Sequence, residues 1–284
     1  MKIGFIGLGI MGEPMCENIV KKHDDTVYVF DVVEEKVQKL VQKGAAGCKD
    51  AVELASKSDL IISMVPKSEH VRTVYREILP VLDQTKICMD MSTIDPAVSI
   101  KTAKQVKETG AQFLDAPVVK SKPAATAGTL GIYVGGEPQA YRAVKPILAF
   151  MGENIIHMGD NGKGLVMKIC HNALVSQIQN GVNETLHLAG LNGIDIQEFA
   201  TAISYGGGQN FYLDSKKDVM ERKEYAAAFS VENMAKDVDI CLNLAKESGF
   251  LMPGEANVGV VYEKALAQGY GKKDFSVTYE IVGE

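Results

Sequence analysis

The sequence predicts two domains of different fold class: an α/β domain over residues 1–161 and an all-helical domain over residues 162–284. Three observations lead to this prediction. Short apolar runs alternate with amphipathic stretches up to about residue 160, as in βαβ units around a parallel sheet. A glycine-rich GxGxxG turn follows the first run. The segment 164–193 then contains no proline, and its apolar residues recur every three or four positions, which predicts one long helix.

The apolar runs of the first domain are short and apolar at successive positions, which is typical of strands covered on both faces. They are KIGFIG (2–7), VYVFD (27–31), LIISMVP (60–66), KICMDMS (86–92), FLDAPVV (113–119) and LGIYVGG (130–136). Segments between them, such as EEKVQKLVQKG, have helical spacing and end in glycine. The long helix is expected to end near Gly190 or Gly193. Further helices, joined by the segments YGGGQN, ESGFLMPG and AQGYGKKD, should follow it.

Composition and charge exclude several classes of protein. The net charge of -6 over 284 residues argues against a general nucleic-acid binder, which would be basic. The five cysteines are far apart and form no CxxC pair, and the histidines show no metal-ligand spacing, so neither a disulfide framework nor a metal site is expected. No apolar stretch reaches the roughly 18 residues of a membrane span. We therefore predict a cytoplasmic protein without nucleic-acid or membrane partners.

The motif GLGIMG (7–12) predicts a Rossmann-type site for a dinucleotide, although a tight turn without a ligand is the alternative. It follows a predicted strand and opens a helix, so amides at the helix start should face a pyrophosphate. Asp31 ends the second strand, where its carboxylate can hold ribose hydroxyls and repel a 2′-phosphate. Lys36, the nearest cation, is expected more than one turn into the next helix, so NAD is favoured over NADP. The predicted cofactor-binding residues here are Gly7, Gly9, Ile10, Met11, Gly12 and Asp31.

Lys168 is the candidate catalytic residue of the long helix. It shares one helix face with Asn172, four positions on. Its neighbours are apolar at nearly every position, and desolvation would lower the pKa of its ammonium enough for proton transfer near neutrality. A solvated surface lysine is the alternative. His171 points about 100° away from this face, as a core histidine or as a catalytic one.

Together these motifs resemble the β-hydroxyacid dehydrogenase family over nearly the whole chain. GFIGLGIMGEPM resembles the family's opening signature, and SMVP and DMSTIDP resemble its two loops beside the nicotinamide. DAPV followed by GTL resembles its substrate loop, and GDNGKGLVMKICHN its catalytic signature. FSVENMAKDVDICLNLA resembles the late helix that borders the active site. The resemblance implies a fold like that of 6-phosphogluconate dehydrogenase and a homodimer or homotetramer.

The resemblance also implies residue roles. Lys168 would be the general acid/base, with Asn172 oriented beside it. The implied cofactor contacts are Met64, Val65, Pro66, Thr93 and Lys236. Phe229 and Asp237 would border the substrate.

The chain departs from the family pattern at two places. Where the usual substrate loop reads Ser-Gly-Gly, this chain has Val119, Lys120 and Ser121. The sequence VKS resembles a smaller branch, the 3-sulfolactaldehyde reductases. Lys120 would contact the anionic group of the substrate and Ser121 would add a hydroxyl donor, or else Lys120 extends to solvent and shields the turn. His171 replaces the first of two asparagines in the catalytic signature.

The predicted function is NAD-dependent interconversion of a small 3-hydroxyacid, or its sulfonate analogue, and the corresponding semialdehyde. The cofactor carries the hydride and one lysine carries the proton. Two alternatives stay open: a non-catalytic NAD-binding sensor, and an enzyme like the imine reductases, relatives that generally lack the lysine at this site.

Overall fold

A nine-stranded sheet forms the centre of the first of two units, Met1–Lys168, in the computed structural model, which describes residues 1–283. The strand order is β3-β2-β1-β4-β5-β6-β8-β7, with β9 beside β8. All neighbours from β3 to β6 are parallel, whereas β8 runs antiparallel to β6 and β7. The strands are β1 Ile3–Ile6, β2 Val27–Phe30, β3 Ala46–Gly47, β4 Leu60–Ser63, β5 Ile87–Asp90, β6 Gln112–Asp115, β7 Val118–Val119, β8 Leu130–Gly136 and β9 Gly152–Gly159.

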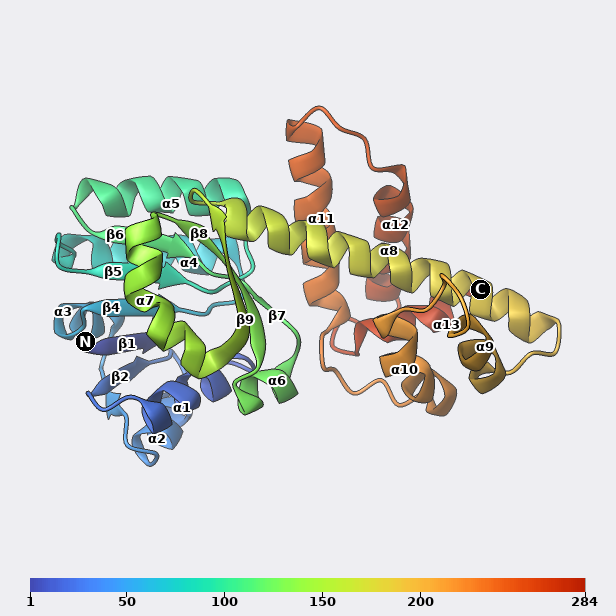
Figure 1. Ribbon diagram of the computed structural model, residues 1–284, viewed down its shortest axis with the longest axis horizontal. Helices are drawn as coiled ribbons and strands as arrows, with labels where there is room; N and C mark the ends of the chain where they lie inside the picture. Colours follow the sequence, from blue (N-terminus) through green and yellow to red (C-terminus); the bar gives the residue numbers. More distant parts are fainter. Residues whose placement is uncertain (284) are drawn as a thin grey trace. The chain divides into compact units, whose positions relative to one another are not determined.

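Helices cover both faces of this sheet (Figure 1). They are α1 Gly12–Lys22, α2 Glu34–Val41, α3 Ala51–Lys57, α4 Ser68–Ile78, α5 Pro96–Glu108, α6 Lys122–Ala127 and α7 Pro138–Met151. A short 3₁₀ turn, η1 Leu79–Val81, follows α4. Helices α1, α2 and α7 pack on one face, and α3, α4 and α5 on the other. The connection after β1 leads to one side of the sheet and the connection after β4 to the other, so the strand order reverses beside β1. Ligands of such sheets bind at this point.

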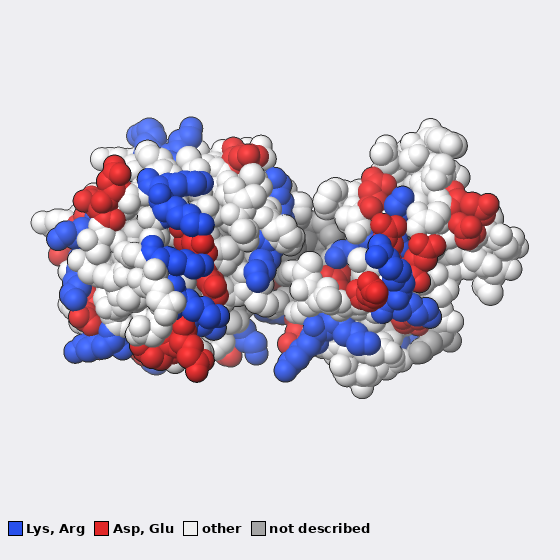
Figure 2. Space-filling model, turned by 90° about the horizontal axis from the view of Figure 1, so that it is seen from below, with Lys and Arg blue, Asp and Glu red and all other residues white. Residues whose placement is uncertain are grey.

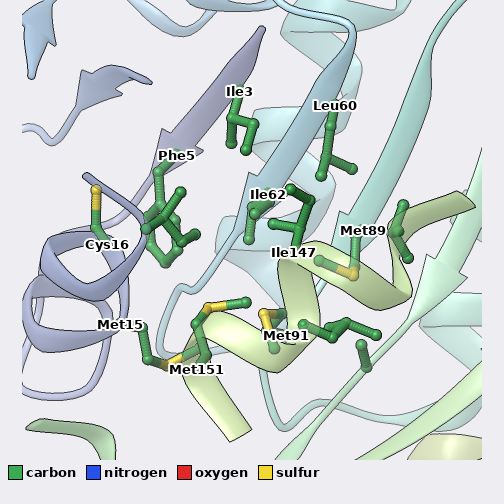
Figure 3. Packing of buried hydrophobic residues seen from close by; sticks show 14 of the residues in the cluster. Ile3, Phe5, Met15, Cys16, Leu60, Ile62, Met89, Met91, Ile147 and Met151 are labelled. Carbon is green, nitrogen blue, oxygen red and sulfur yellow. The ribbon is translucent and has the colours of Figure 1, made fainter. Parts of the chain in front are cut away.

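Successive side chains along each central strand point to opposite faces of the sheet. Ile3 and Phe5 of β1 and Leu60 and Ile62 of β4 point toward α1 and α7, where Figure 3 shows them packed with methionines of several elements. Ile61, between the last two, faces the opposite helices. Because both faces are buried, each central strand is apolar at every position, which is the pattern that predicted them.

The second unit, Ile169 onward, is helical. The long helix α8 spans Lys163–Leu191, so the division between the units falls inside it. The remaining elements are α9 Ile196–Ile203, α10 Phe211–Arg222, α11 Val231–Glu247, α12 Pro253–Ala267, η2 Phe275–Val277 and α13 Thr278–Val282. Their apolar side chains form a core of their own around Val231, Tyr262 and Val277. Through residue 283, no helix is long and apolar enough to cross a membrane.

The predicted fold class is confirmed, and three details of the sheet differ from the prediction. The run 113–119 forms two strands, because the chain breaks at Ala116 and Pro117 between β6 and β7. The sheet is mixed rather than wholly parallel, since β8 pairs antiparallel to β6. Strands β3 and β9 were not predicted.

Candidate active site

The three glycines of the loop after β1 have different surroundings. Gly7 has φ +95, and a Cβ there would lie 2.2 Å from the Met64 carbonyl oxygen. A Cβ on Gly12, the first residue of α1, would lie 2.0 Å from the carbonyl oxygen of Gly7. A Cβ on Gly9 meets no described atom within 4 Å. Gly7 and Gly12 therefore close the turn, whereas Gly9 leaves its backbone open to a ligand, as a pyrophosphate requires.

The side chains of this loop divide in the same way. Ile10 is 67% exposed, and Met11, half-buried, precedes α1 and packs against the sheet core. Ile10 therefore presents an apolar side chain at the surface of the loop, whereas Met11 anchors the loop to the core.

Asp31 follows β2 and is fixed by the backbone. Its Oδ2 accepts from the Leu8 amide at 2.7 Å, and its Oδ1 accepts from the Val33 amide at 2.9 Å. The prediction for Lys36 was wrong: it lies in the first turn of α2, and its Nζ is 3.7 Å from Asp31 Oδ1. Val32, 91% exposed, lies beside this carboxylate. A carboxylate and an exposed apolar side chain at this strand end fit the ribose and adenine of a dinucleotide.

The loops after β4 and β5 lie side by side, because these strands are parallel neighbours. Met64, Val65 and Pro66 follow β4, and Thr93 lies beyond the end of β5. Met64, Val65 and Thr93 are half-buried and Pro66 is exposed. These four residues lie at the carboxyl edge of the sheet, as do the glycine loop after β1 and Asp31 after β2. Ten of the predicted cofactor contacts are therefore at one edge of the sheet.

The substrate loop contains an unusual backbone conformation. Val119 is buried in β7, and Ser121 is the half-buried N-cap residue of α6. Between them Lys120 has φ 78, a left-handed conformation that favours glycine. Its exposed side chain donates from Nζ to the Thr129 carbonyl oxygen at 2.6 Å. The structure thus places Lys120 at the end of a strand with a polar contact across the turn. Lys122, also exposed, is the first residue of α6.

Asp115 fixes the start of α8, and sequence reasoning missed it. This buried last residue of β6 accepts from the Gly162 amide at 2.7 Å and from the Leu165 amide at 3.0 Å. Burial raises the pKa of its carboxyl group, although the hydrogen bonds from these two amides act to lower it. A Cβ on Gly135 or Gly164 would come within 2.8 Å of its oxygens, so both glycines make room for it. The only sequence signal was an acid at the end of an apolar run.

Lys168 and Asn172 lie one turn apart on α8, and both are buried, Lys168 with 7% of its surface exposed. The Asn172 amide donates to Asp237 Oδ2 at 2.5 Å. Lys236, half-buried beside it on α11, has its Nζ 2.9 Å from Asp237 Oδ1. Asn172, Lys236 and Asp237 are therefore brought together, and Asp237 joins α8 to α11. His171 is half-buried.

Phe229 lies just before α11, on a segment held by a buried carboxylate. Asp274 Oδ2 accepts from the amides of Ala228 and Phe229 at 3.0 and 3.3 Å. Lys216 Nζ lies 2.8 Å from Asp274 Oδ1, and its hydrogen bond contributes to a lowered pKa of that carboxyl group despite burial. The ring of Phe229 meets that of Phe275 edge to face. Sequence reasoning did not identify Asp274 as the residue that orders this segment.

A row of buried polar residues continues along α8 beyond Asn172. Its members are Ser176, Gln179 and Asn183. Ser176 Oγ lies 3.0 and 3.2 Å from the two carboxylate oxygens of Glu255, a fully buried residue of α12. Desolvation raises the pKa of Glu255 to about 7, although Ser176 and Gln177 lower it. The helical unit therefore holds a carboxyl group that is half protonated near neutrality.

Replacing Glu255 with glutamine is expected to stabilise the protein at high pH. A folded-state pKa of about 7 against an ordinary 4.5 means that the native state binds more protons between these values. The stability contributed by protonated Glu255 is present below about pH 4.5 and is lost as pH rises through 7. Glu255→Gln should therefore raise the free energy of unfolding by up to about 3 kcal/mol at pH 8 and change it little at pH 4.5. Urea unfolding at both pH values measures this. An equal effect at the two pH values would contradict it.

The described residues contain no group of three or more His, Cys, Asp or Glu side chains placed to hold a metal ion. On the face drawn in Figure 2, basic side chains stand close to acidic ones on both units. The open backbone at Gly9, the carboxylate of Asp31 and the adjacent loops after β4 and β5 fit a dinucleotide cofactor.

Two family models together match nearly all of the chain. Residues 2–159 match the NAD binding domain of 6-phosphogluconate dehydrogenase. Residues 162–282 match the model described as NAD-binding of NADP-dependent 3-hydroxyisobutyrate dehydrogenase.

Named relatives are similar over nearly their full length. The 2-(hydroxymethyl)glutarate dehydrogenase of Eubacterium barkeri is 32% identical over 285 residues, 99% of this chain and 94% of the relative. The NAD-dependent L-serine dehydrogenase of Pseudomonas aeruginosa is 33% identical over 290 residues, 99% of this chain and 97% of the relative. The structure of Mycobacterium tuberculosis 3-hydroxyisobutyrate dehydrogenase with L-serine superposes with a TM-score of 0.93 at 27% identity, covering 100% of this chain and 99% of that one.

Proposed function

The chain belongs to the β-hydroxyacid dehydrogenase family, and from this premise we propose that it oxidises a small 3-hydroxyacid, or the sulfonate analogue of one, to its semialdehyde, and catalyses the reverse reduction. Its general reaction is oxidoreduction of a hydroxyacid with NAD. The relatives are named after three compounds: 2-(hydroxymethyl)glutarate, L-serine and 3-hydroxyisobutyrate. Each compound carries a hydroxymethyl group on the carbon next to a carboxylate. That shared chemistry supports a substrate of the form HOCH2–CHX–anion.

The observation that carries the proposal is the buried Lys168, one helical turn from Asn172. NAD supplies the two-electron chemistry by accepting a hydride in oxidation and returning it in reduction. Lys168 Nζ takes the hydroxyl proton as the carbonyl forms, and it returns that proton in reduction. Asn172, held by Asp237, keeps its amide in one orientation beside the lysine. For Phe229, Asp237 and Lys236 we propose the substrate and cofactor contacts that the resemblance implies.

We also propose NAD rather than NADP as the preferred cofactor. Asp31 presents a carboxylate whose two oxygens are already fixed by backbone amides, so it cannot turn away from a 2′-phosphate without losing both hydrogen bonds. Lys36, close to Asp31, reduces this repulsion but does not remove it.

A homodimer or homotetramer remains part of the proposal. Large apolar side chains are exposed on the helical unit, among them Leu174, Leu191, Phe211, Phe250 and Leu251. Burying some of these side chains between copies of the chain would remove apolar surface from water, which supports an interface of this kind.

The strained Lys120 supports recognition of the substrate's anion. A non-glycine residue pays roughly 1 kcal/mol for the left-handed conformation, and the usual family loop has glycine here. A lysine held in a strained conformation at a strand end is typical of functional positions. Its contact with the Thr129 carbonyl is exposed and can be exchanged for a substrate anion.

Lys120→Gly is expected to raise KM for the anionic substrate about tenfold with kcat nearly unchanged, because a charge-assisted hydrogen bond is lost. The free energy of unfolding should change by less than about 1 kcal/mol, since relief of strain offsets the lost bond to Thr129. Initial rates of NADH formation are measured with a carboxylate and a sulfonate on the same short backbone. KM should rise more for whichever of these two compounds the wild type turns over more efficiently.

Lys223→Gly is the matched control. Lys120 and Lys223 are the two non-glycine residues with positive φ in the described chain, and Lys223 follows α10 as its C-cap residue. Its replacement should leave KM unchanged. Equal KM for wild type and Lys120→Gly would return Lys120 to the role of a surface charge. Absence of turnover with every hydroxyacid tested would reject the proposed function itself.

A further inference from the structure

A buried hydrogen-bond network lies beneath the loops after β4 and β5. Asp90, the last residue of β5, has no exposed surface. Its Oδ1 accepts from Ser63 Oγ and from Ser92 Oγ, each at 2.7 Å. Ser92 Oγ in turn accepts from the backbone amide of Val65 at 2.9 Å. The network therefore links the end of β5 to the loop after β4.

The two serines have the same bond to Asp90 but different second partners. Ser92 continues to Val65, in the loop predicted to contact cofactor. Ser63 continues to the hydroxyl of Tyr75 on α4, at 3.1 Å, in the apolar core. One branch of the network thus ends in the cofactor loop and the other ends inside the domain.

Asp90 is buried in a way that lowers the stability of the fold. Burial raises the pKa of its carboxyl group to about 6, although Ser92 and Ser63 act to lower it. Within residues 1–283, its Oδ2 has no hydrogen-bond partner. A buried carboxylate with one oxygen unsatisfied is destabilising, and such groups are typically kept where they orient a functional site.

We propose that Asp90 and Ser92 are a positioning pair that fixes the Val65 loop against the nicotinamide end of the bound cofactor. This inference rests on the proposed function, because it takes the loops after β4 and β5 as the nicotinamide contacts. The Ser92 hydroxyl donates its proton to Asp90 and accepts the Val65 N–H, so the carboxylate also fixes the direction of the hydroxyl. Neither residue contacts the reacting atoms in this scheme.

Two ligands separate the ends of the cofactor. NADH and ADP-ribose share the adenosine and the pyrophosphate, and only NADH carries nicotinamide. Dissociation constants of both are measured by titration calorimetry for wild type, Ser92→Ala and Ser63→Ala. Ser92→Ala is expected to weaken NADH binding about tenfold, because the Val65 amide loses its acceptor. ADP-ribose binding should stay within twofold in this variant, and Ser63→Ala should change neither constant by more than twofold.

Equal losses of NADH and ADP-ribose binding in Ser92→Ala would overturn the inference, as would equal effects of the two serine variants. Asp90→Asn and Asp90→Ala give a second comparison. Asparagine keeps an acceptor oxygen for Ser92, so Asp90→Asn should keep the wild-type ratio of the dissociation constants of NADH and ADP-ribose. Asp90→Ala removes this acceptor and should weaken NADH binding relative to ADP-ribose binding. No hydroxyacid enters these measurements, so failure of the proposed reaction, seen as wild type without turnover, is distinguishable from failure of this inference.

Discussion

Replacing Lys168 with alanine is expected to lower kcat for the best hydroxyacid about 10³-fold, the range of general acid–base catalysis. The hydroxyl proton would have no acceptor as the carbonyl forms, since the neighbouring amide of Asn172 donates to Asp237 and cannot take a proton. NADH should bind with a dissociation constant within about threefold of wild type, because the cofactor loops lie on other elements. Steady-state kinetics and NADH titration measure the two effects.

The control is Lys163→Ala, a lysine at the start of the same helix. Lys163 is exposed and lies 3.8 Å from Asp160, a weak surface pair. Its removal should leave kcat within twofold. Comparable turnover in Lys168→Ala and wild type would reject Lys168 as the acid/base, and binding of NADH without any turnover in wild type would favour the non-catalytic sensor.

Gly9→Ala is expected to weaken NADH binding about 100-fold, because a methyl group would occupy the space that a pyrophosphate needs beside the backbone amides. The fold should tolerate it, since the added Cβ meets no described atom within 4 Å and Gly9 does not have the positive φ of Gly7. The free energy of unfolding should therefore change by less than about 1 kcal/mol. Fluorescence titration with NADH and thermal unfolding are the measurements.

Gly181→Ala makes the same chemical change in the helical unit. Gly181 lies within α8, also with no described atom within 4 Å of a Cβ. Alanine is the better helix former, so this variant should gain about 0.5–1 kcal/mol and keep the NADH affinity of wild type. Unimpaired NADH binding by Gly9→Ala would mean that the loop is a tight turn and does not cradle the pyrophosphate.

The sequence predicted the parts of the fold whose signal is local. The strands of the central sheet were visible because each is a short apolar run between turn residues. Strand β3 has two residues, too few for any period. Strand β9 is partly exposed, and its sequence GENIIHMG mixes polar and apolar residues without a period of two. The antiparallel direction of β8 depends on its pairing with β6 and β7, which an apolar run does not encode.

In the candidate site too, the residues of continuous motifs were predicted, and those with partners far along the chain were not. The glycine loop and Asp31 belong to one continuous motif, and Lys168 with Asn172 to another, so spacing alone suggested them. Asp115 binds residues 47 and 50 positions away, and Ser176 meets Glu255 at a separation of 79. A buried polar residue of this kind is recognised only when its distant partners are known. Lys36 was misplaced because the start of α2 has no side-chain cap to mark it.

The helix α8 sets a rule for exchanging domains between relatives. The compact units divide after Lys168, so a chimera joined there would take its lysine from one parent and its asparagine from the other. A junction between residues 161 and 162 keeps both on one parental piece. That junction passes between Asp115 and the amides of Gly162 and Leu165, so both parents must offer the same acid and the same small residues at this join. The contacts between Asp115 and the start of α8, rather than Lys168 and Asn172, therefore restrict which domains can be exchanged.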